Sequence, residues 1–304
     1  MVIPFAPPVL ADRAAICKAV SDAKAVENDA SFVNIYLLRQ KYGIEIAFSD
    51  TMLLRRYQDG FRRDSYGFPL GAGDLRHALK LLRDDAAARA LPLRLTMLTK
   101  AQCERLQLEF PDCFTFTPAE NYTEYLYLRE NLAEMRGSRY HGKRNHISQF
   151  WRAYPDAYIQ PLIPENAEFA LQIADQWLAA RPDPSESSLL FERACIKEAA
   201  ANLEALGLSG LLLYADGQPI GMTMVSEISA GIYDIHYEKV ISGYPHAWPV
   251  VANEMAKCLS GAQYLNREED LGENGMRTSK QSYRPDILNE KFIAEWHGKE
   301  SHLC

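Results

Sequence analysis

Hydrophobic and polar residues alternate most clearly in the second half of the chain, where helical and strand periods follow one another. Residues 166–180 and 189–206 have helical spacing, and residues 211–225 form two apolar stretches joined through Asp216 and Gly217, a strong hairpin signal. The elements predicted after this hairpin are a strand at 231–240, a helix at 248–259, a strand at 263–266, a helix at 276–284 and a strand at 287–296. This order predicts an α/β fold with a mostly antiparallel sheet.

The first half follows a looser version of the same plan. An alanine-rich segment at residues 11–30 has periodic apolar positions and is predicted to be a helix. The elements predicted next are strands at 44–48, 51–57 and 65–69, a helix at 74–91, a strand at 93–98, a helix at 99–110, and strands at 114–117 and 122–128. Together the two halves predict a two-lobed molecule, with a domain at residues 1–135 and another at residues 136–304.

A basic helix is predicted at residues 139–154, where the second domain begins. Ile147, Phe150, Trp151 and Tyr154 recur at helical spacing and form one buried stripe. Lys143 lies on another side of the same helix. This segment is unusual because it gathers positive charge in an acidic protein.

Composition narrows the class of protein. The chain has 304 residues, of which 47% are hydrophobic, so it can bury a full core. Its formal charge of -7 argues against duplex DNA as a partner, because DNA affinity rests on neutralised phosphates. The six cysteines form no C-x-x-C pair, there is no secretory signal, and no apolar run has the length of a membrane span. We therefore expect a cytoplasmic protein without a membrane span.

Two groups of basic residues are the first candidates for a binding site. The motifs of phosphate-binding loops, nucleophile elbows and zinc proteases are absent, and histidines and cysteines show no metal spacing, so no metal is expected. The first basic group surrounds Lys143 and Arg144, and the second has Arg277 and Lys280 on one helical face. Both suit a bound anion. The alternative is a solvated face whose charges pair with the acidic run at residues 268–270.

A strand face at residues 234–238 is the candidate for proton transfer. Alternation places Asp234, His236 and Glu238 on one side of the strand, where they can reach one cleft. A polar face turned to solvent explains the same pattern. Asn266 and Glu268, at the end of the next strand, could complete such a site. The free N–H groups of the helix that begins near Pro249 could bind an anion there. Tyr283 could act as a phenolic acid, although packing alone also explains a tyrosine at this position.

Several segments resemble a known bacterial family. The hairpin, strand, helix and strand order after residue 211 is similar to the plan of the Gcn5-related N-acetyltransferases (GNAT). More specifically, YHGKRNHISQF at 140–150 and YLNREEDLGENGMRTSKQSYRPDILNEKF at 264–292 resemble the domain found at the C-terminus of phosphatidylglycerol lysyltransferases. NIYLLRQKYGIEIA at 34–47 and DIHYEKV at 234–240 fit the same pattern. The resemblance covers nearly the whole chain.

The resemblance implies two tandem GNAT-like domains, each a mixed, mostly antiparallel sheet with helices on both faces. It implies acyl or aminoacyl transfer from a carrier to a hydroxyl or amine, with Glu238, His236 and Tyr283 as catalytic candidates. The residues that match the family's motifs, and are expected to bind substrate, are Lys143, Arg144, Asn145, His146, Asn266, Glu268, Asp270, Arg277 and Lys280.

Two departures from the family shape the expected reaction. Because no apolar run in this sequence has the length of a membrane span, we expect no counterpart of the long membrane-embedded part of the lysyltransferases, and a lipid acceptor is a weaker expectation. Its loop at residues 241–249 holds Pro245 and Pro249, which cannot donate an N–H to a pyrophosphate. We therefore expect the acceptor end of aminoacyl-tRNA as a co-substrate more than acyl-CoA, and direct transfer without a covalent enzyme intermediate. The rival hypothesis is a non-catalytic module that binds a small anion or nucleotide.

Overall fold

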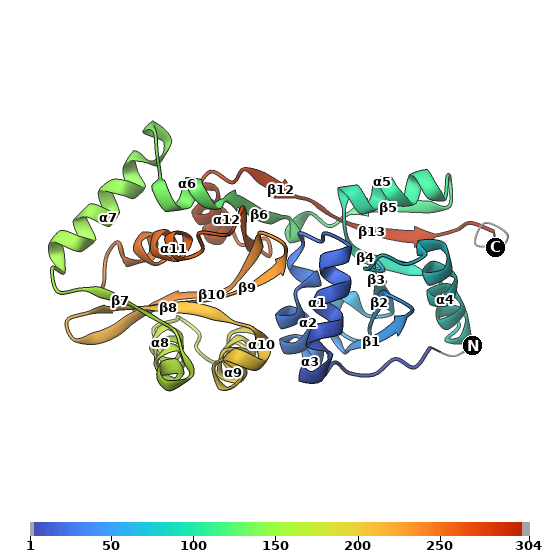
Figure 1. Ribbon diagram of the computed structural model, residues 1–304, viewed down its shortest axis with the longest axis horizontal. Coiled ribbons are helices and arrows are strands. Elements are labelled where there is room, and N and C mark those ends of the chain that lie inside the picture. The colour runs from blue at the N-terminus through green and yellow to red at the C-terminus, as the bar shows by residue number, and fades with distance from the viewer. Residues whose placement is uncertain (1–2, 300–304) are drawn as a thin grey trace.

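Two mixed β-sheets form the centre of the molecule, and helices pack beside each of them (Figure 1). The computed structural model describes residues 3–299. This architecture confirms the predicted α/β class with two mostly antiparallel sheets. None of the helices within residues 3–299 combines the length and apolar character that a bilayer crossing requires.

The first sheet has the strand order β1-β2-β3-β4-β13-β5. Its strands are β1 (Ile44–Ser49), β2 (Met52–Tyr57), β3 (Ser65–Gly67), β4 (Arg94–Thr99), β5 (Phe114–Pro118) and β13 (Lys291–Trp296). The β3–β4 pair is parallel, and the other pairs are antiparallel. The helices of this half are α1 (Arg13–Asp22), α2 (Phe32–Leu37), α3 (Arg39–Tyr42), α4 (Leu75–Ala88) and α5 (Lys100–Glu109). Figure 1 shows α1 and α2 standing between the two sheets.

The second sheet has the strand order β12-β6-β11-β10-β9-β8-β7. Its strands are β6 (Glu124–Leu128), β7 (Tyr158–Pro161), β8 (Ser209–Ala215), β9 (Gln218–Ser229), β10 (Ile232–Val240), β11 (Tyr264–Glu269) and β12 (Ile287–Asn289). The β10–β11 pair is parallel, and its neighbours are antiparallel. The predicted hairpin is confirmed, since Asp216 and Gly217 both have positive φ between β8 and β9.

Helices cover both faces of the second sheet. They are α6 (Arg129–Glu134), α7 (His141–Ala153), α8 (Ala167–Ala179), α9 (Ser187–Ala201), α10 (Leu203–Leu206), α11 (Ala247–Cys258) and α12 (Asn274–Gln281). Figure 1 shows α8, α9 and α10 on one side and α6, α7 and α11 on the other. The short 3₁₀ helices are Leu10–Asp12, Asn28–Ala30, Gly60–Arg62, Glu120–Tyr122, Ser138–Tyr140 and Pro164–Asn166.

The two sheets exchange strands near the ends of the two halves. β6 precedes residue 135 but pairs with β11 and β12 in the second sheet. β13 comes from the end of the chain but lies between β4 and β5 in the first sheet. The domain boundary at residue 135 stays a prediction, and the exchanged strands β6 and β13 connect the two sheets.

Three predicted elements differ from the observed ones. The strand predicted at 287–296 is two strands, because the chain leaves the second sheet at Asn289 and enters the first at Lys291. The helix predicted at 11–30 ends at Asp22, because Lys24 takes a positive φ that α-helix cannot continue. The helix predicted at 189–206 breaks at Asn202, whose φ of -131° and ψ of 29° lie outside the α-helical region.

Candidate functional site

The parallel strands β10 and β11 pair only over their first residues and then separate. Their register runs from Ile232 opposite Tyr264 to Asp234 opposite Asn266. Beyond that point, Arg267 of β11 reaches across and donates from Nη2 to Glu238 Oε1 of β10 at 2.7 Å. Both side chains are largely buried, with exposures of 12% and 7%. An ion pair thus spans the gap between two strands that no longer share backbone hydrogen bonds.

This ion pair is only half satisfied. Arg267 Nη1 and Glu238 Oε2 are buried and have no hydrogen-bond partner among the described residues. A buried polar atom without a partner costs roughly 1–3 kcal/mol, so native proteins seldom leave one without a reason. A donor and an acceptor left free on the same ion pair suit a ligand that offers both kinds of group.

Lys143 of α7 and Tyr283, which follows α12, complete the site. Lys143 Nζ lies 3.7 Å from the centre of the Tyr283 ring, and the Arg267 guanidinium lies 4.7 Å from the same ring. Burial, and then the nearby Arg267 charge, lower the pKa of Lys143 to about 8. Burial raises the pKa of Tyr283 to about 12. We name these four residues, Glu238, Arg267, Tyr283 and Lys143, the Glu238 site.

Two histidines stack between α7 and the start of α11. The rings of His146 and His246 are 4.5 Å apart and inclined by 25°. His246 precedes the first residue of α11 with a positive φ of 68°, a conformation that is uncommon for a residue other than glycine. Partial burial, His246 and Lys143 all lower the pKa of His146, which favours a neutral ring. The start of α11 is therefore joined to the basic helix by a ring contact.

Comparison with known families identifies the chain's relatives. A family model described as phosphatidylglycerol lysyltransferase, C-terminal, matches residues 22–295. The chain belongs to this family. No curated protein is similar enough to be matched to the chain.

Solved structures agree with this membership in the family. A conserved protein of unknown function from Bacteroides thetaiotaomicron is 31% identical, with a TM-score of 0.92 over 97% of this chain and 100% of that one. A C-terminal DUF2156 domain from Agrobacterium fabrum, described as part of a lysylphosphatidylglycerol synthetase, is 12% identical, with a TM-score of 0.65 over 97% and 94%. L-PGS from Bacillus licheniformis is 13% identical, with a TM-score of 0.60 over 91% and 94%. The two distant structures share the fold, and the family supports a transferase-like function.

The residues of the first family-like motif, 143–146, make different contacts in the fold. Lys143 joins the Glu238 site, while Arg144 donates from Nη1 to the carbonyl oxygens of Met135 and Gly137, the second at 2.7 Å. Arg144 thereby fixes the chain that leads into α7. Asn145 is exposed, and His146 stacks on His246. Within this motif Lys143 is the residue that contacts the other members of the site.

In the second motif the side chains of Arg277 and Lys280 bind groups of the same chain. Arg277 makes a bidentate ion pair with Asp270, with Nε 2.8 Å and Nη2 3.1 Å from the two carboxylate oxygens. Lys280 Nζ donates to the carbonyl oxygen of Arg267 at 2.6 Å and to that of Glu269. These contacts match the alternative in which the acidic run pairs with the basic helix. Both residues support the end of β11 rather than an anion.

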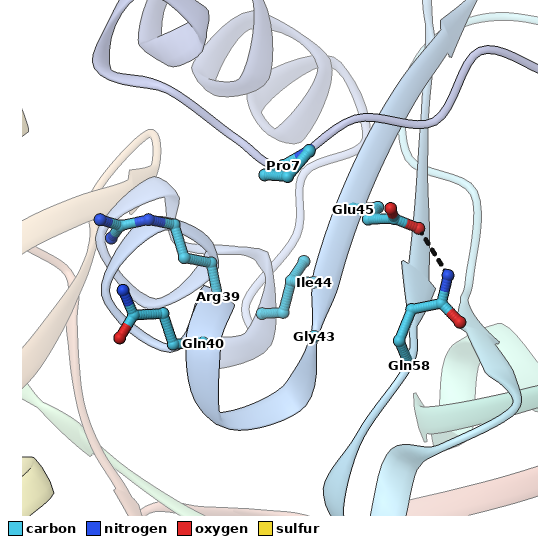
Figure 2. A pocket seen from close by; sticks show the side chains of 7 residues that line it. All are labelled: Pro7, Arg39, Gln40, Gly43, Ile44, Glu45 and Gln58. Atoms are coloured by element: carbon cyan, nitrogen blue, oxygen red, sulfur yellow. Dashed lines mark hydrogen bonds between the residues drawn. The ribbon is translucent and has the colours of Figure 1, made fainter.

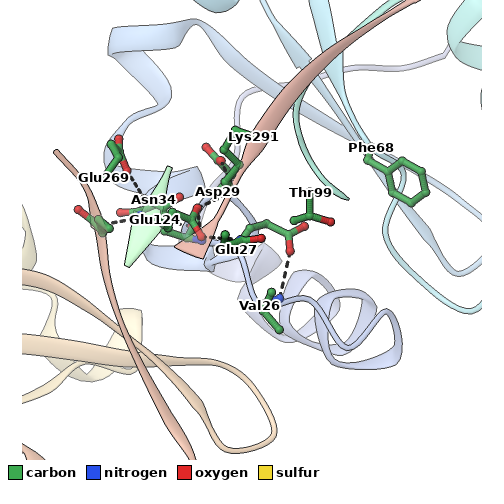
Figure 3. A network of polar contacts seen from close by, with 12 residues as sticks. Val26, Glu27, Asp29, Asn34, Phe68, Thr99, Glu124, Glu269 and Lys291 are labelled. Carbon is green, nitrogen blue, oxygen red and sulfur yellow. Dashed lines mark hydrogen bonds and ion pairs between the residues drawn. The ribbon is translucent and has the colours of Figure 1, made fainter. Parts of the chain in front are cut away.

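A buried polar network around Lys291, Glu124 and Asp29 lies between the two sheets (Figure 3). Lys291 Nζ of β13 lies 2.6 Å from Glu124 Oε1 of β6 and 3.3 Å from Asp29 Oδ2. Asp29 also pairs with Arg62, and Asn266 Nδ2 donates to Glu124 Oε2 at 2.9 Å. We name Lys291, Glu124, Asp29 and Arg62 the Lys291 network. Asn266 therefore holds the junction of the sheets and is enclosed within it.

The predicted strand face is divided by a β-bulge. The pairing of β10 with β9 shifts between Ile235 and Tyr237, next to His236. Glu238 pairs with Arg267, whereas Asp234 and His236 belong to a second buried cluster together with Glu268. The side chain of His236 is 1% exposed, and burial lowers its pKa to about 3. The geometry thus contradicts the expectation that His236 takes a proton from a substrate.

A surface hollow of about 390 Å³ lies away from these residues, beside α3 and β1 (Figure 2). Arg39 and Gln40 line one wall, and Glu45 and Gln58, joined by a 2.8 Å hydrogen bond, line the other. The described residues around this hollow include none of the predicted site residues. We assign it no role in the reaction.

Sequence reasoning missed Arg267, the central residue of the Glu238 site. The sequence holds one indication of its role. Arg267 lies between Asn266 and Glu268 on a predicted strand, and because neighbouring residues on a strand point to opposite faces, its side chain is expected on the face opposite to theirs. Asn34 lies in a segment that resembles the family, and its side-chain amide contacts Asp234 and Glu268. No spacing within the sequence connects residues so far apart along the chain.

Proposed function

We propose that the chain moves an activated acyl or aminoacyl group from a carrier to an amine or hydroxyl acceptor at the Glu238 site. The observation that carries the proposal is the half-satisfied ion pair of Glu238 and Arg267 at the point where β10 and β11 separate. Lys143 adds a second cation there, on an element that precedes both strands. The proposal gives the family's transferase-like function a place in this chain.

Each residue of the site has a role in this proposal. Arg267 and Lys143 attract the negatively charged carrier and stabilise the oxyanion that forms when the acceptor attacks the ester carbonyl. Glu238 Oε2 receives the proton that the attacking nitrogen or oxygen releases, and this proton returns to the leaving oxygen of the carrier when the ester bond breaks. The Tyr283 hydroxyl donates a hydrogen bond to that leaving oxygen. His236 has no role in this proposal, because its two ring nitrogens contact Ser226 and Asn34 in a separate cluster.

Aminoacyl-tRNA is the carrier that this site favours. Pro245 lies in the loop before α11 and Pro249 in the first turn of that helix, so this region offers few N–H groups to the pyrophosphate of an acyl-CoA. His246 occupies the position before the helix and stacks on His146. Flat aromatic rings beside two cations suit the exposed bases and phosphates at a tRNA acceptor end.

The test is a transfer assay with purified protein and radiolabelled aminoacyl-tRNA. The acceptors are soluble amines, peptides with free N-termini, and phosphatidylglycerol vesicles, so that small-molecule, peptide and lipid acceptors are distinguished. Acetyl-CoA replaces the tRNA in a parallel series. Glu238→Gln is expected to reduce the transfer rate by roughly 10²–10⁴-fold, the usual contribution of a positioned proton acceptor. Lys143→Met is expected to raise the concentration of tRNA needed for half-maximal rate.

Glu254→Gln is the matched control, because Glu254 is on α11 and pairs with Lys257 near the surface. It should transfer at the wild-type rate. Melting temperatures of the three variants separate a lost reaction from a lost fold. Binding of charged tRNA without transfer to any acceptor would support the non-catalytic module and overturn the enzyme. Equal rates in Glu238→Gln and wild type would remove the Glu238 site from the reaction.

A further inference from the structure

A second buried cluster joins three elements beside the Lys291 network. Asp234 and His236 come from β10, and Glu268 comes from the end of β11. One potential ligand atom from each lies within 4.8 Å of the others. Asn34 of α2 completes the group, with Oδ1 3.2 Å from His236 Nδ1. We name these four residues the Asp234 cluster.

The hydrogen bonds within the Asp234 cluster leave its acceptors unsatisfied. Asn34 Nδ2 carries two hydrogens but faces three acceptors: the Asn28 carbonyl at 3.2 Å, Asp234 Oδ2 at 3.1 Å and Glu268 Oε1 at 2.9 Å. Asp234 Oδ1 is buried and has no hydrogen-bond partner among the residues described. At least one oxygen of the cluster therefore lacks a donor.

No lysine or arginine among the described residues forms an ion pair with the Asp234 cluster; the charge of Lys280, which donates to backbone carbonyls, acts on Glu268 from farther away. In the adjoining Lys291 network, Asp29 pairs with Arg62 and Lys291, and Glu124 pairs with Lys291. Within residues 3–299, the ion-pair contacts of Asp234 and Glu268 are with His236 alone. A buried charge without a partner is costly, so a cation from solution is a direct way to satisfy two neighbouring carboxylates.

We propose that Asp234, His236 and Glu268 bind one divalent first-row transition-metal cation, such as Mn²⁺ or Zn²⁺. Two carboxylates and one imidazole are ligands that these ions accept, whereas Mg²⁺ and Ca²⁺ prefer oxygen alone. In the bound form the Asn34 amide turns so that Oδ1 replaces Nδ2 as a fourth ligand. The argument for this site does not rest on the proposed transfer reaction, and its ligands are not members of the Glu238 site.

The present geometry needs only small movements to accept the ion. Two ligands at about 2.0–2.2 Å from a metal are separated by roughly 3–3.5 Å. His236 Nδ1 lies 3.4 Å from Asp234 Oδ2 and 3.9 Å from Glu268 Oε1. His236 Nε2 lies 2.8 Å from Ser226 Oγ, so the ring can donate its hydrogen there and leave Nδ1 free for the metal. Glu268, with a side chain 26% exposed, provides the route of entry.

The cation would act as a structural clamp. It would connect α2, from the first half of the chain, to β10 and β11 of the second sheet. Asp234 and His236 have side-chain exposures of 0% and 1%, so a substrate has no access to the far side of the ion. Binding is therefore expected to raise the melting temperature more than it changes any reaction.

The experiment measures binding of the metal alone. Full-length protein is stripped with EDTA, dialysed, and titrated with Mn²⁺ by calorimetry and with Co²⁺ by visible absorption. We expect one equivalent per chain and a higher melting temperature. Asp234→Asn should lose both effects, and its metal-free form should melt above metal-free wild type, because a repulsion between carboxylates is removed. Ser226→Ala should weaken binding by roughly 10–100-fold.

Asn34→Asp is a second test of the metal site that does not depend on how well the other variants fold. A third carboxylate should lower the melting temperature of the metal-free protein and enlarge the rise that Mn²⁺ produces. Cys258→Ser is the matched control, because Cys258 is an exposed thiol and its loss should leave Mn²⁺ binding unchanged. Absence of saturable binding in wild type would overturn the proposal. Unchanged binding in Asp234→Asn would do so as well.

Discussion

Lys291→Met tests the junction between the two sheets most directly. Lys291 is the first residue of β13, and its side chain is 1% exposed between Glu124 and Asp29. Burial disfavours its charge, but the two carboxylates outweigh burial and raise the pKa of Lys291. Methionine has a similar volume and no charge, so the substitution removes the ion pairs while the core stays filled.

The expected loss of stability follows from the partners that Asp29 and Glu124 keep when Lys291 is replaced. Asp29 keeps Arg62 as a partner, whereas Glu124 keeps only amide and backbone donors, among them Asn266 and Asn289. Removing one partner of a buried pair typically costs about 3–5 kcal/mol, which is a large part of the roughly 5–15 kcal/mol that stabilises a domain. Burial raises the pKa of Glu124 to about 7 even beside Lys291, and losing the Lys291 charge is expected to raise this pKa further. Protonation of Glu124 therefore favours the folded state, and the deficit should shrink as pH falls from 8 to 5.

Urea denaturation, followed by tryptophan fluorescence and circular dichroism at several pH values, measures this deficit. Lys18→Met is the control, because Lys18 is 70% exposed and pairs with Asp22 on the surface of α1. It should change stability by less than about 1 kcal/mol. The double variant Lys291→Met with Glu124→Gln should recover part of the loss, since no unpaired carboxylate remains. A Lys291→Met cost no larger than that of Lys18→Met would refute the reasoning.

Three further predictions concern the second sheet. Because the pKa of Lys143 is about 8, its amine should react at pH 8 with a limiting amount of an amine-reactive acetylating reagent faster than the amines of exposed lysines. Peptide mass spectrometry measures these rates, and equal rates would contradict the lowered pKa. Arg277→Ala should raise the pKa of Asp270, now about 2, so that stability is lost at a higher pH during acid titration by circular dichroism; an unchanged acid midpoint would contradict this. Tyr283→Phe keeps the contact of Lys143 with the ring but removes the hydroxyl that interacts with Arg267, so it should lower the melting temperature only slightly and should slow transfer; full activity would remove the hydroxyl from the mechanism.

The order of elements in the second half could be predicted because local signals agree there. Asp216 and Gly217 determine the hairpin, and Pro249 lies in the first turn of α11, where its missing N–H costs nothing. The exchange of β6 and β13 between sheets could not be predicted in this way. Residues 287–296 have one uninterrupted strand pattern, and only the long-range partners of Asn289 and Lys291 show that two sheets share it.

The candidate site, like the fold, could be predicted from the sequence only in part. The segments that resemble the family include Lys143, Glu238 and Tyr283, and the fold brings these three residues close to one another. Sequence alone could not separate residues that support the fold from residues that face a ligand. Arg277 and Lys280 have the charge of an anion site, yet their nitrogens are taken by Asp270 and by backbone carbonyls, which only the folded chain reveals.

The short run of Asn266, Arg267 and Glu268 in β11 connects the Glu238 site to the proposed metal site. Arg267 belongs to the first site, and its neighbour Glu268, at a bulge with a positive φ of 57°, belongs to the second. If both proposals hold, losing the cation frees Glu268 and shifts the strand that positions Arg267. Removal of the metal should then lower kcat with little change in KM for the tRNA, because Lys143 is on a separate helix. Transfer rates measured in EDTA and after Mn²⁺ is restored would show this, and a kcat independent of the metal would separate the two sites.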